Sequence, residues 1–220
     1  MYSPELVKKY TDKRDDYREN DVEILGTLES CGVKDRVVLD FGCGDGRNSQ
    51  QILALGARKV VGIDISKEMI ELALRRRQDN LEFIVADGSH IPSDDTVFDV
   101  IFSNFVIHYF EDASVPFAEI ARVLKSSGYF VGAFNITDVE KGFERLYNTN
   151  MPIRLGKMED NIIVRNRIKS RAEIEQSLHD CGLTLVSYKI LHHPNAVVDD
   201  SFEYKDKVTK NAVLIVARTG

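Results

Sequence analysis

The stretch VVLDFGCGDG, residues 37–46, decides the fold. Its first residues are mostly apolar, which is typical of a strand buried on both faces of a sheet. The glycines at positions 42, 44 and 46 permit a tight turn with positive φ and let a ligand contact bare backbone at the start of the following helix. The stretch therefore predicts a strand, a ligand-binding turn and a helix in succession.

Strand and helix patterns alternate on both sides of this stretch. Strands are predicted at residues 36–41, 59–63, 81–86, 97–103 and 128–134. Helices are predicted at residues 5–19, 22–31, 47–55, 67–77 and 115–124. The connections are long enough for crossovers, so the alternation predicts an α/β fold with a mostly parallel sheet and helices on both faces. Ligands of such sheets bind beyond the carboxyl ends of the strands.

The C-terminal part departs from this alternation. Residues 135–169 show no regular period and are predicted to be an irregular insertion. A helix at residues 170–181 and strands at residues 183–191 and 211–217 are expected to follow. We therefore expect one domain over residues 1–220, with an N-terminal helical flap at residues 1–32 and the insertion at residues 135–169 inside the domain.

Composition limits the class of function. The chain has 220 residues, and 29 Lys and Arg against 35 Asp and Glu give a net charge of −6. Nucleic-acid-binding proteins usually carry a basic surplus, so nucleic acid is not an expected partner. The sequence has neither the apolar core of a signal peptide nor the ~18–20 apolar residues of a membrane span. The three cysteines are widely spaced and no metal-ligand pattern accompanies them, so reduced thiols and no metal site are expected. We further expect a cytoplasmic protein that is a monomer or a homodimer.

Two acidic residues follow the next two predicted strands. Asp64 ends the strand VVGID, eighteen residues after Gly46, and Asp87 ends the strand FIVAD. A carboxylate in the first of these places can accept two hydrogen bonds from ribose hydroxyls. The spacing also argues against a nicotinamide dehydrogenase, because the G-x-G-x-x-G fingerprint would need a glycine where Arg47 stands.

With these motifs in this order, the chain from Val37 to Asn135 resembles the class I S-adenosylmethionine-dependent methyltransferases, in particular small-molecule members. The resemblance implies a Rossmann-like, doubly wound sheet of seven strands, mostly parallel with an antiparallel C-terminal strand. It also implies S-adenosylmethionine as the cofactor and S-adenosylhomocysteine as the product. The family's cofactor positions fall on Asp40, Gly42, Cys43, Gly44, Gly46, Asp64, Ile65, Met69, Asp87, Gly88 and Asn104.

The resemblance gives several of these residues a specific role. Asp64 would bind the ribose, Ile65 would touch the adenine, and Asp87 would receive the adenine amino group. Asn104, together with Ser103, would face the amino group at the methionine end of the cofactor. All of these positions belong to the carboxyl ends of the predicted strands.

Two aromatic residues of the N-terminal flap are further candidates. Tyr10 and Tyr17 are seven residues apart and share one face of the predicted helix. They would close over the methionine end of the cofactor, or they would simply pack the helix onto the domain. The insertion at residues 135–169 would form a lid over the acceptor, or its apolar residues would only pack it onto the sheet.

Little catalytic machinery is required. A sulfonium methyl group is already an electrophile, so the protein mainly aligns the acceptor atom with the S–CH3 bond and excludes water. A general base is needed only when the acceptor atom carries a proton. His108, with a reference pKa of about 6.5, is the first candidate base and Tyr109 the second. The alternative for both is that they pack a short helix.

An alternating row of cations is a candidate for acceptor selection. Arg165, Arg167, Lys169 and Arg171 would project from one face of an extended chain. They could select an acidic acceptor, or they could form a solvated edge that prevents strands from aggregating.

The sequence thus predicts a methyltransferase that moves a methyl group from S-adenosylmethionine to oxygen or nitrogen of a small molecule. A protein or RNA methyltransferase, and a relative that binds the cofactor without catalysis, are the alternatives.

Overall fold

The computed structural model describes residues 21–155, 162–191 and 196–220. The helix predicted at residues 5–19, with Tyr10 and Tyr17, lies outside these ranges. The described α-helices are α2 (Asp21–Ser30), α3 (Arg47–Ala54), α4 (Lys67–Ala73), α5 (Ser114–Val123) and α6 (Arg171–Asp180). The strands are β1 (Val37–Phe41), β2 (Lys59–Asp64), β3 (Leu81–Val85), β4 (Phe98–Asn104), β5 (Leu124–Val139), β6 (Asn150–Leu155), β7 (Ile162–Arg167), β8 (Leu183–Leu191), β9 (Ala196–Val198) and β10 (Val208–Thr219).

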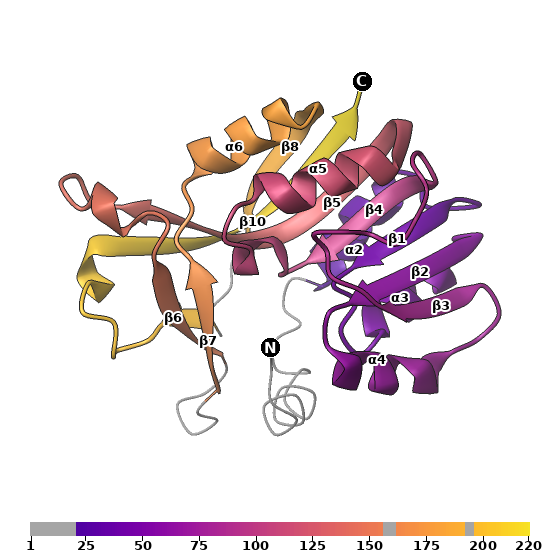
Figure 1. Ribbon diagram of the computed structural model, residues 1–220, viewed down its shortest axis with the longest axis horizontal. Coiled ribbons are helices and arrows are strands. Elements are labelled where there is room, and N and C mark those ends of the chain that lie inside the picture. Colours follow the sequence, from indigo (N-terminus) through magenta and orange to yellow (C-terminus); the bar gives the residue numbers. More distant parts are fainter. Residues whose placement is uncertain (1–20, 156–161, 192–195) are drawn as a thin grey trace.

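The main sheet has seven strands in the order β3-β2-β1-β4-β5-β10-β8 (Figure 1). Strands β1 to β5 pair in parallel, and β10 pairs antiparallel with both β5 and β8. Strand order reverses at β1, where β2 lies on one side and β4 on the other. The predicted doubly wound sheet with an antiparallel C-terminal strand is therefore confirmed.

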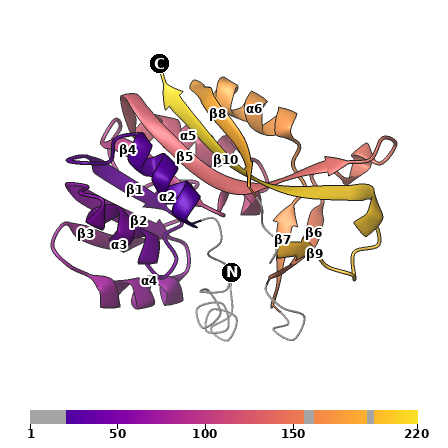
Figure 2. The ribbon, with the colours of Figure 1, turned by 180° about the vertical axis from the view of Figure 1, so that it is seen from behind.

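Apolar side chains on the two faces of this sheet form two cores. On one face, Phe117 and Ile120 of α5 and Ile174 of α6 pack with residues of β1, β4, β5 and β10. On the other face, Ile24 of α2 and Ile52 of α3 pack against the same strands. Figure 2 shows α2 and α3 on this face of the sheet. Each central strand is thus buried on both sides, which explains the continuous apolar runs in its sequence.

The predicted helix at residues 67–77 is shorter in the structure. Helix α4 ends at Ala73, and residues Leu74–Arg76 form a turn of 3-10 helix. Ser66 caps the start of α4 through its hydroxyl, which accepts a hydrogen bond from the backbone N–H of Met69 at 3.2 Å. Helix ends are the least certain part of any sequence-based assignment, because local signals weaken there.

The prediction that residues 135–169 are irregular is wrong. Strand β5 continues to Val139 and forms a long antiparallel ribbon with β10, beyond the edge of the neighbouring strands (Figure 1). Residues Asn150–Leu155 and Ile162–Arg167 are strands β6 and β7 of a second sheet, in the order β7-β6-β9. Pro152 and several charges hide the period of two in this segment, and the partner strand β9 lies some forty residues further along the chain.

A small apolar core holds this second sheet together. It consists of Leu146, Met151, Ile153, Val164 and Ile168, with further aromatic residues packed against it. The segment that looked irregular in sequence is therefore a compact layer attached to the β5–β10 ribbon.

The cation row at residues 165–171 does not form a solvated edge throughout. Lys169 is completely buried, and its Nζ donates to the backbone oxygen of Glu111 at 2.7 Å and lies 3.3 Å from the carboxylate of Glu173. Arg167 donates to the carboxylate of Glu111 at 3.1 Å, and Arg171 pairs with Glu175. Arg167 and Lys169 instead tie the end of β7 to the chain that follows β4.

No helix in the described part of the chain is long and apolar enough to cross a bilayer.

Lys169→Met should lower the free energy of unfolding by roughly 1.5–3 kcal/mol, because it removes a buried charge-assisted hydrogen bond to Glu111. Chemical denaturation would measure the change. Lys67→Met removes a lysine whose exposed ion pair with Glu71 is 3.9 Å long, and it should leave stability nearly unchanged. A Lys169 variant as stable as the Lys67 variant would show that the hydrogen bond between Lys169 and Glu111 contributes nothing to stability.

Candidate ligand-binding site

The glycine turn after β1 is fixed from two sides. Gly42, Gly44 and Gly46 all have positive φ, of 76°, 54° and 79°. The backbone N–H groups of Gly42 and Cys43 both donate to the carbonyl of Ile63 at 2.8 Å. A Cβ on Gly42 would lie 2.2 Å from Cγ2 of Val106, in the segment after β4. The turn therefore needs glycine at this position both for its conformation and for close packing.

Asp64 at the end of β2 holds the same turn. Its Oδ2 accepts a hydrogen bond from the backbone N–H of Gly44 at 2.9 Å, and its Oδ1 accepts from that of Ser66 at 2.8 Å. The side chain is half-buried, so its orientation is fixed while part of it stays accessible. A carboxylate oxygen has more than one lone pair, and the carboxylate can still accept bonds from a ligand.

Asp40 takes a different position from Asp64. It is buried, and its Oδ2 accepts from the hydroxyl of Ser49 at 2.5 Å. Since Ser49 lies in α3, this contact joins the end of β1 to the helix that follows the turn. Asp40 thus positions the turn.

Sequence reasoning missed the role of Arg76. Its Nε donates to the backbone oxygen of Asp45 at 3.0 Å, and its guanidinium lies 3.4 Å from the Asp45 carboxylate, which also pairs with Arg47. Asp45 is itself buried. An arginine beyond the end of α4 therefore supports the far side of the glycine turn, which no local pattern in the sequence indicated.

Apolar side chains border the acidic residues at this edge. Ile65 and Val85 are 53% and 50% exposed, although both are large and apolar. They lie close together, because Asp64 and Val85 are register partners on β2 and β3. Met69, the other apolar position predicted for the cofactor, is buried in α4. This pair offers a flat apolar ligand a surface next to two carboxylates.

Asp87 is exposed at the end of β3, and its Oδ1 accepts from the backbone N–H of Ser89 at 2.9 Å. Gly88 beside it leaves no room for a side chain, because a Cβ would lie 2.2 Å from the ring of Phe41. Both residues thus occupy the predicted edge.

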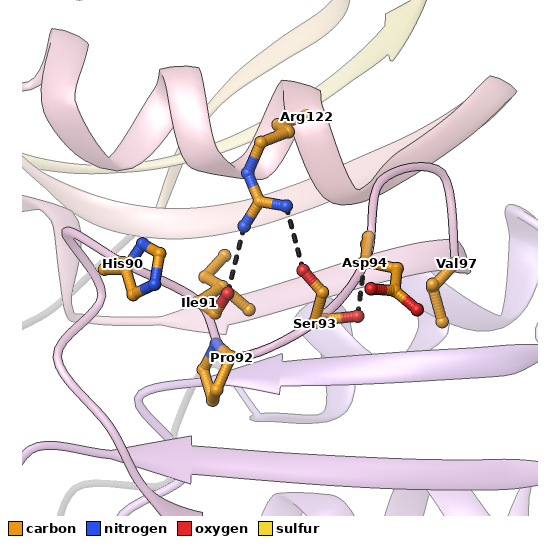
Figure 3. A pocket seen from close by; sticks show the side chains of 7 residues that line it. All are labelled: His90, Ile91, Pro92, Ser93, Asp94, Val97 and Arg122. Atoms are coloured by element: carbon orange, nitrogen blue, oxygen red, sulfur yellow. Dashed lines mark hydrogen bonds between the residues drawn. The ribbon is translucent and has the colours of Figure 1, made fainter.

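The loop after Asp87 is held by Arg122 of α5. Its guanidinium donates to the carbonyls of Ile91 and Ser93, each at 2.9 Å, and to the carboxylates of Glu119 and Asp95. A shallow hollow lies between this loop and the arginine (Figure 3). It borders the amino ends of β4 and β5, where Val97 bonds to Val123, and so lies at the edge opposite the glycine turn.

The end of β4 presents buried polar atoms. The Oγ of Ser103 and the Oδ1 of Asn104 are both buried, and neither has a hydrogen-bond partner in the described part of the chain. Phe105, the next residue, has a φ of 58° and donates its backbone N–H to Ala133 at 2.6 Å. A buried amide oxygen without a donor is unfavourable, so Asn104 is suited to accept a hydrogen bond from a ligand.

His108 and Tyr109 lie in a 3-10 turn, η3 (Ile107–Tyr109), with ring centroids 4.4 Å apart. His108 is buried, and its Nδ1 accepts a hydrogen bond from the backbone N–H of Asn135 at 3.2 Å. In the neutral ring the proton then sits on Nε2, which makes that nitrogen a donor. A base role would require Nδ1 to give up this contact. Tyr109 is 42% exposed.

Cys43 is not a nucleophile in this turn. Burial, with the nearby carboxylates of Asp40 and Asp64, raises the pKa of its thiol well above the ordinary value. The thiol therefore stays protonated and packs against Gly62.

The chain matches the family model described as "Methyltransferase domain" over residues 39–132. It is 28% identical over 134 residues to malonyl-[acyl-carrier protein] O-methyltransferase of Legionella pneumophila, covering 56% of this chain and 47% of that protein. It is 30% identical over 177 residues to an uncharacterized protein of Haemophilus influenzae, covering 66% of this chain and 70% of that protein. The chain spans about half the length, or less, of the first curated relatives it matches.

Solved structures share the fold. A crystal structure of geranyl diphosphate C-methyltransferase from Streptomyces coelicolor, in complex with Mg2+, geranyl diphosphate and S-adenosyl-L-homocysteine, superposes with a TM-score of 0.69 at 18% identity. The match covers 92% of this chain and 78% of that chain.

Gly42→Ala should be far more destabilising than Gly182→Ala. Both glycines have a φ near +76°, but a Cβ on Gly182 would meet nothing within 4 Å, whereas one on Gly42 would clash with Val106. The shared backbone strain is about 1–2 kcal/mol, and the clash should add roughly 1–3 kcal/mol to the loss at Gly42. Chemical denaturation of both variants would measure the difference, and equal losses would disprove the packing argument.

Proposed function

The chain belongs to the class I S-adenosylmethionine-dependent methyltransferase superfamily, and we propose that it transfers a methyl group to oxygen or nitrogen of a small molecule. The observation that carries the proposal is the polar edge beyond β1, β2 and β4. There, the fixed carboxylate of Asp64, the glycine turn and the buried amide oxygen of Asn104, which has no partner among the described residues, meet at the point where strand order reverses.

The residues at this edge fit the chemical groups of S-adenosylmethionine. Asp64 would accept hydrogen bonds from the ribose hydroxyls, Ile65 and Val85 would contact the adenine, and Asp87 would receive the adenine amino group. The unpartnered Oδ1 of Asn104 would accept a hydrogen bond from the charged amino group at the methionine end. Asp40, Asp45 and Arg76 would act indirectly by holding the glycine turn.

The reaction asks little of the protein beyond placement. The bound cofactor supplies an electrophilic methyl group, and the chain holds the acceptor atom in line with it and excludes water. His108, as a buried hydrogen-bond donor on Nε2, would orient the acceptor rather than remove its proton. Tyr109, which is partly exposed beside it, remains the candidate that can contact the acceptor directly.

Several features favour a small acceptor. The net charge of −6 opposes RNA, and the named relatives act on a malonyl group carried by a protein and on geranyl diphosphate. We further propose that the chain forms one domain, whose second sheet covers the acceptor side of the site, and that it acts in the cytoplasm as a monomer or homodimer.

Asp64→Asn should weaken the binding of S-adenosylmethionine about 10- to 100-fold in calorimetric titrations. The reason is that hydrogen bonds to a charged acceptor are worth roughly 1.5–3 kcal/mol, and the amide also disturbs the contact with Gly44. Asp94→Asn makes the same change of charge in an exposed loop and should leave the affinity unchanged.

The wild-type titration also tests the proposed function as a whole. Binding of S-adenosylmethionine and S-adenosylhomocysteine, with none of NAD(H), is the expected result. Binding of NAD(H) alone would contradict the assignment of the glycine turn. Binding of S-adenosylmethionine without methyl transfer to any acceptor, in a screen with labelled cofactor, would identify a non-catalytic relative.

A further inference from the structure

Three polar side chains extend one face of the main sheet beyond its carboxyl edge. On the face covered by α2 and α3, the last apolar side chains of β4, β5 and β10 in the core are Phe102, Ala133 and Ala212. Side chains two residues apart on a strand point to the same face. The next positions on that face, each one step beyond the core, are therefore Asn104, Asn135 and Lys210.

These residues lie on neighbouring strands. Asn104 pairs in register with Ala133, and Asn135 pairs in register with Ala212. The Nζ of Lys210 donates to the Oδ1 of Asn135 at 3.4 Å, a long contact with a neutral group. The three side chains thus form a diagonal line that ends in a cation, which we call the Lys210 row.

Lys210 has no anionic partner among the described residues. It is partly buried, and this burial lowers the pKa of its ammonium group to about 8. Within residues 21–155, 162–191 and 196–220, no carboxylate forms an ion pair with it. Charged side chains removed from water are normally paired, because the loss of hydration must be offset. Lys210 at neutral pH is therefore suited to an anionic ligand.

Neighbouring lysines show the usual arrangement. Lys207, three residues before Lys210, pairs with Glu140 at 2.9 Å, and Lys189 of β8 pairs with Glu23. The buried Lys169 lies 3.3 Å from Glu173. The cation row first considered for an acidic acceptor includes three members paired with carboxylates, whereas Lys210 has no such partner in the part of the chain that the structure describes.

The row lies next to residues of the proposed site. It begins at Asn104, the proposed contact of the cofactor's methionine end. Its middle residue, Asn135, donates its backbone N–H to His108 of η3. Phe105 packs partly buried against the same face, so an acceptor here would also meet an apolar surface.

We propose that Lys210 binds a carboxylate group of the methyl acceptor and so selects acidic small molecules that carry an apolar part. This inference rests on the proposed function and names the substrate class of the same site. Asn135 positions the ammonium, and Lys210 determines specificity.

The experiment compares an acid with its uncharged amide. Hexanoate and hexanamide are titrated into the protein saturated with S-adenosylhomocysteine, and into the protein alone should that nucleoside not bind. Wild type should bind hexanoate about 10- to 100-fold more tightly than hexanamide, because one charge-assisted hydrogen bond is worth roughly 1.5–3 kcal/mol. Lys210→Met should abolish this preference, Lys210→Arg should retain most of it, and Lys207→Met, the matched control, should retain it fully.

Each other outcome overturns the inference. Three results would show that Lys210 forms no carboxylate site. They are equal binding of the two probes by wild type, no binding of either at millimolar concentration, and a preference for hexanoate that survives in Lys210→Met. A tenfold loss of S-adenosylhomocysteine affinity in Lys210→Met would assign the lysine to the cofactor instead. Failure of the proposed function gives a different result, since wild type would then not bind S-adenosylhomocysteine at all.

Discussion

The close packing of the glycine turn against the segment after β4 is the constraint on which the rest of the site depends. Gly42 approaches Val106 so closely that no side chain fits between them, and Asp64 holds the same turn through the N–H of Gly44. The ends of β1, β2 and β4 are thereby fixed relative to one another. Protein interiors are densely packed, so a contact this close fixes the relative positions of the two segments. The carboxylate of Asp64 and the amide of Asn104 consequently face one edge in a defined arrangement.

The sequence predicted the elements that depend on local patterns and missed those that depend on residues far apart in the chain. The parallel core was predictable because apolar runs, a glycine turn and strand-end acids such as Asp64 and Asp87 are all local patterns. The second sheet was not, because β6 is completed by β9, and Pro152 and charged residues disguise the alternation. The role of Tyr10 and Tyr17 stays a prediction, since both lie outside the described residues.

Charged residues were the hardest to interpret from sequence, for a related reason. Alternation shows which face a side chain occupies, but its partner comes from elsewhere in the chain. Glu111, which receives the buried Lys169, lies 58 residues before it, and Asp45, which receives Arg76, lies 31 residues before it. A sequence pattern therefore cannot distinguish a cation neutralised within the fold from one that is available to a ligand. Lys210 was overlooked for this reason.

The hydrogen bonds around His108 and the charge of Lys210, which no carboxylate of the described residues pairs, both favour an acidic methyl acceptor. An alcohol or ammonium acceptor needs a base, yet Nδ1 of His108 is occupied by the N–H of Asn135, which leaves Nε2 as a donor. A carboxylate is already ionised at neutral pH, so an oxygen lone pair is available to attack the methyl group. It would bind the cation at one end of the Lys210 row without any proton being removed. A site with a donor histidine and a lysine that lacks a carboxylate partner among the described residues is thus better matched to an acidic acceptor than to a neutral one.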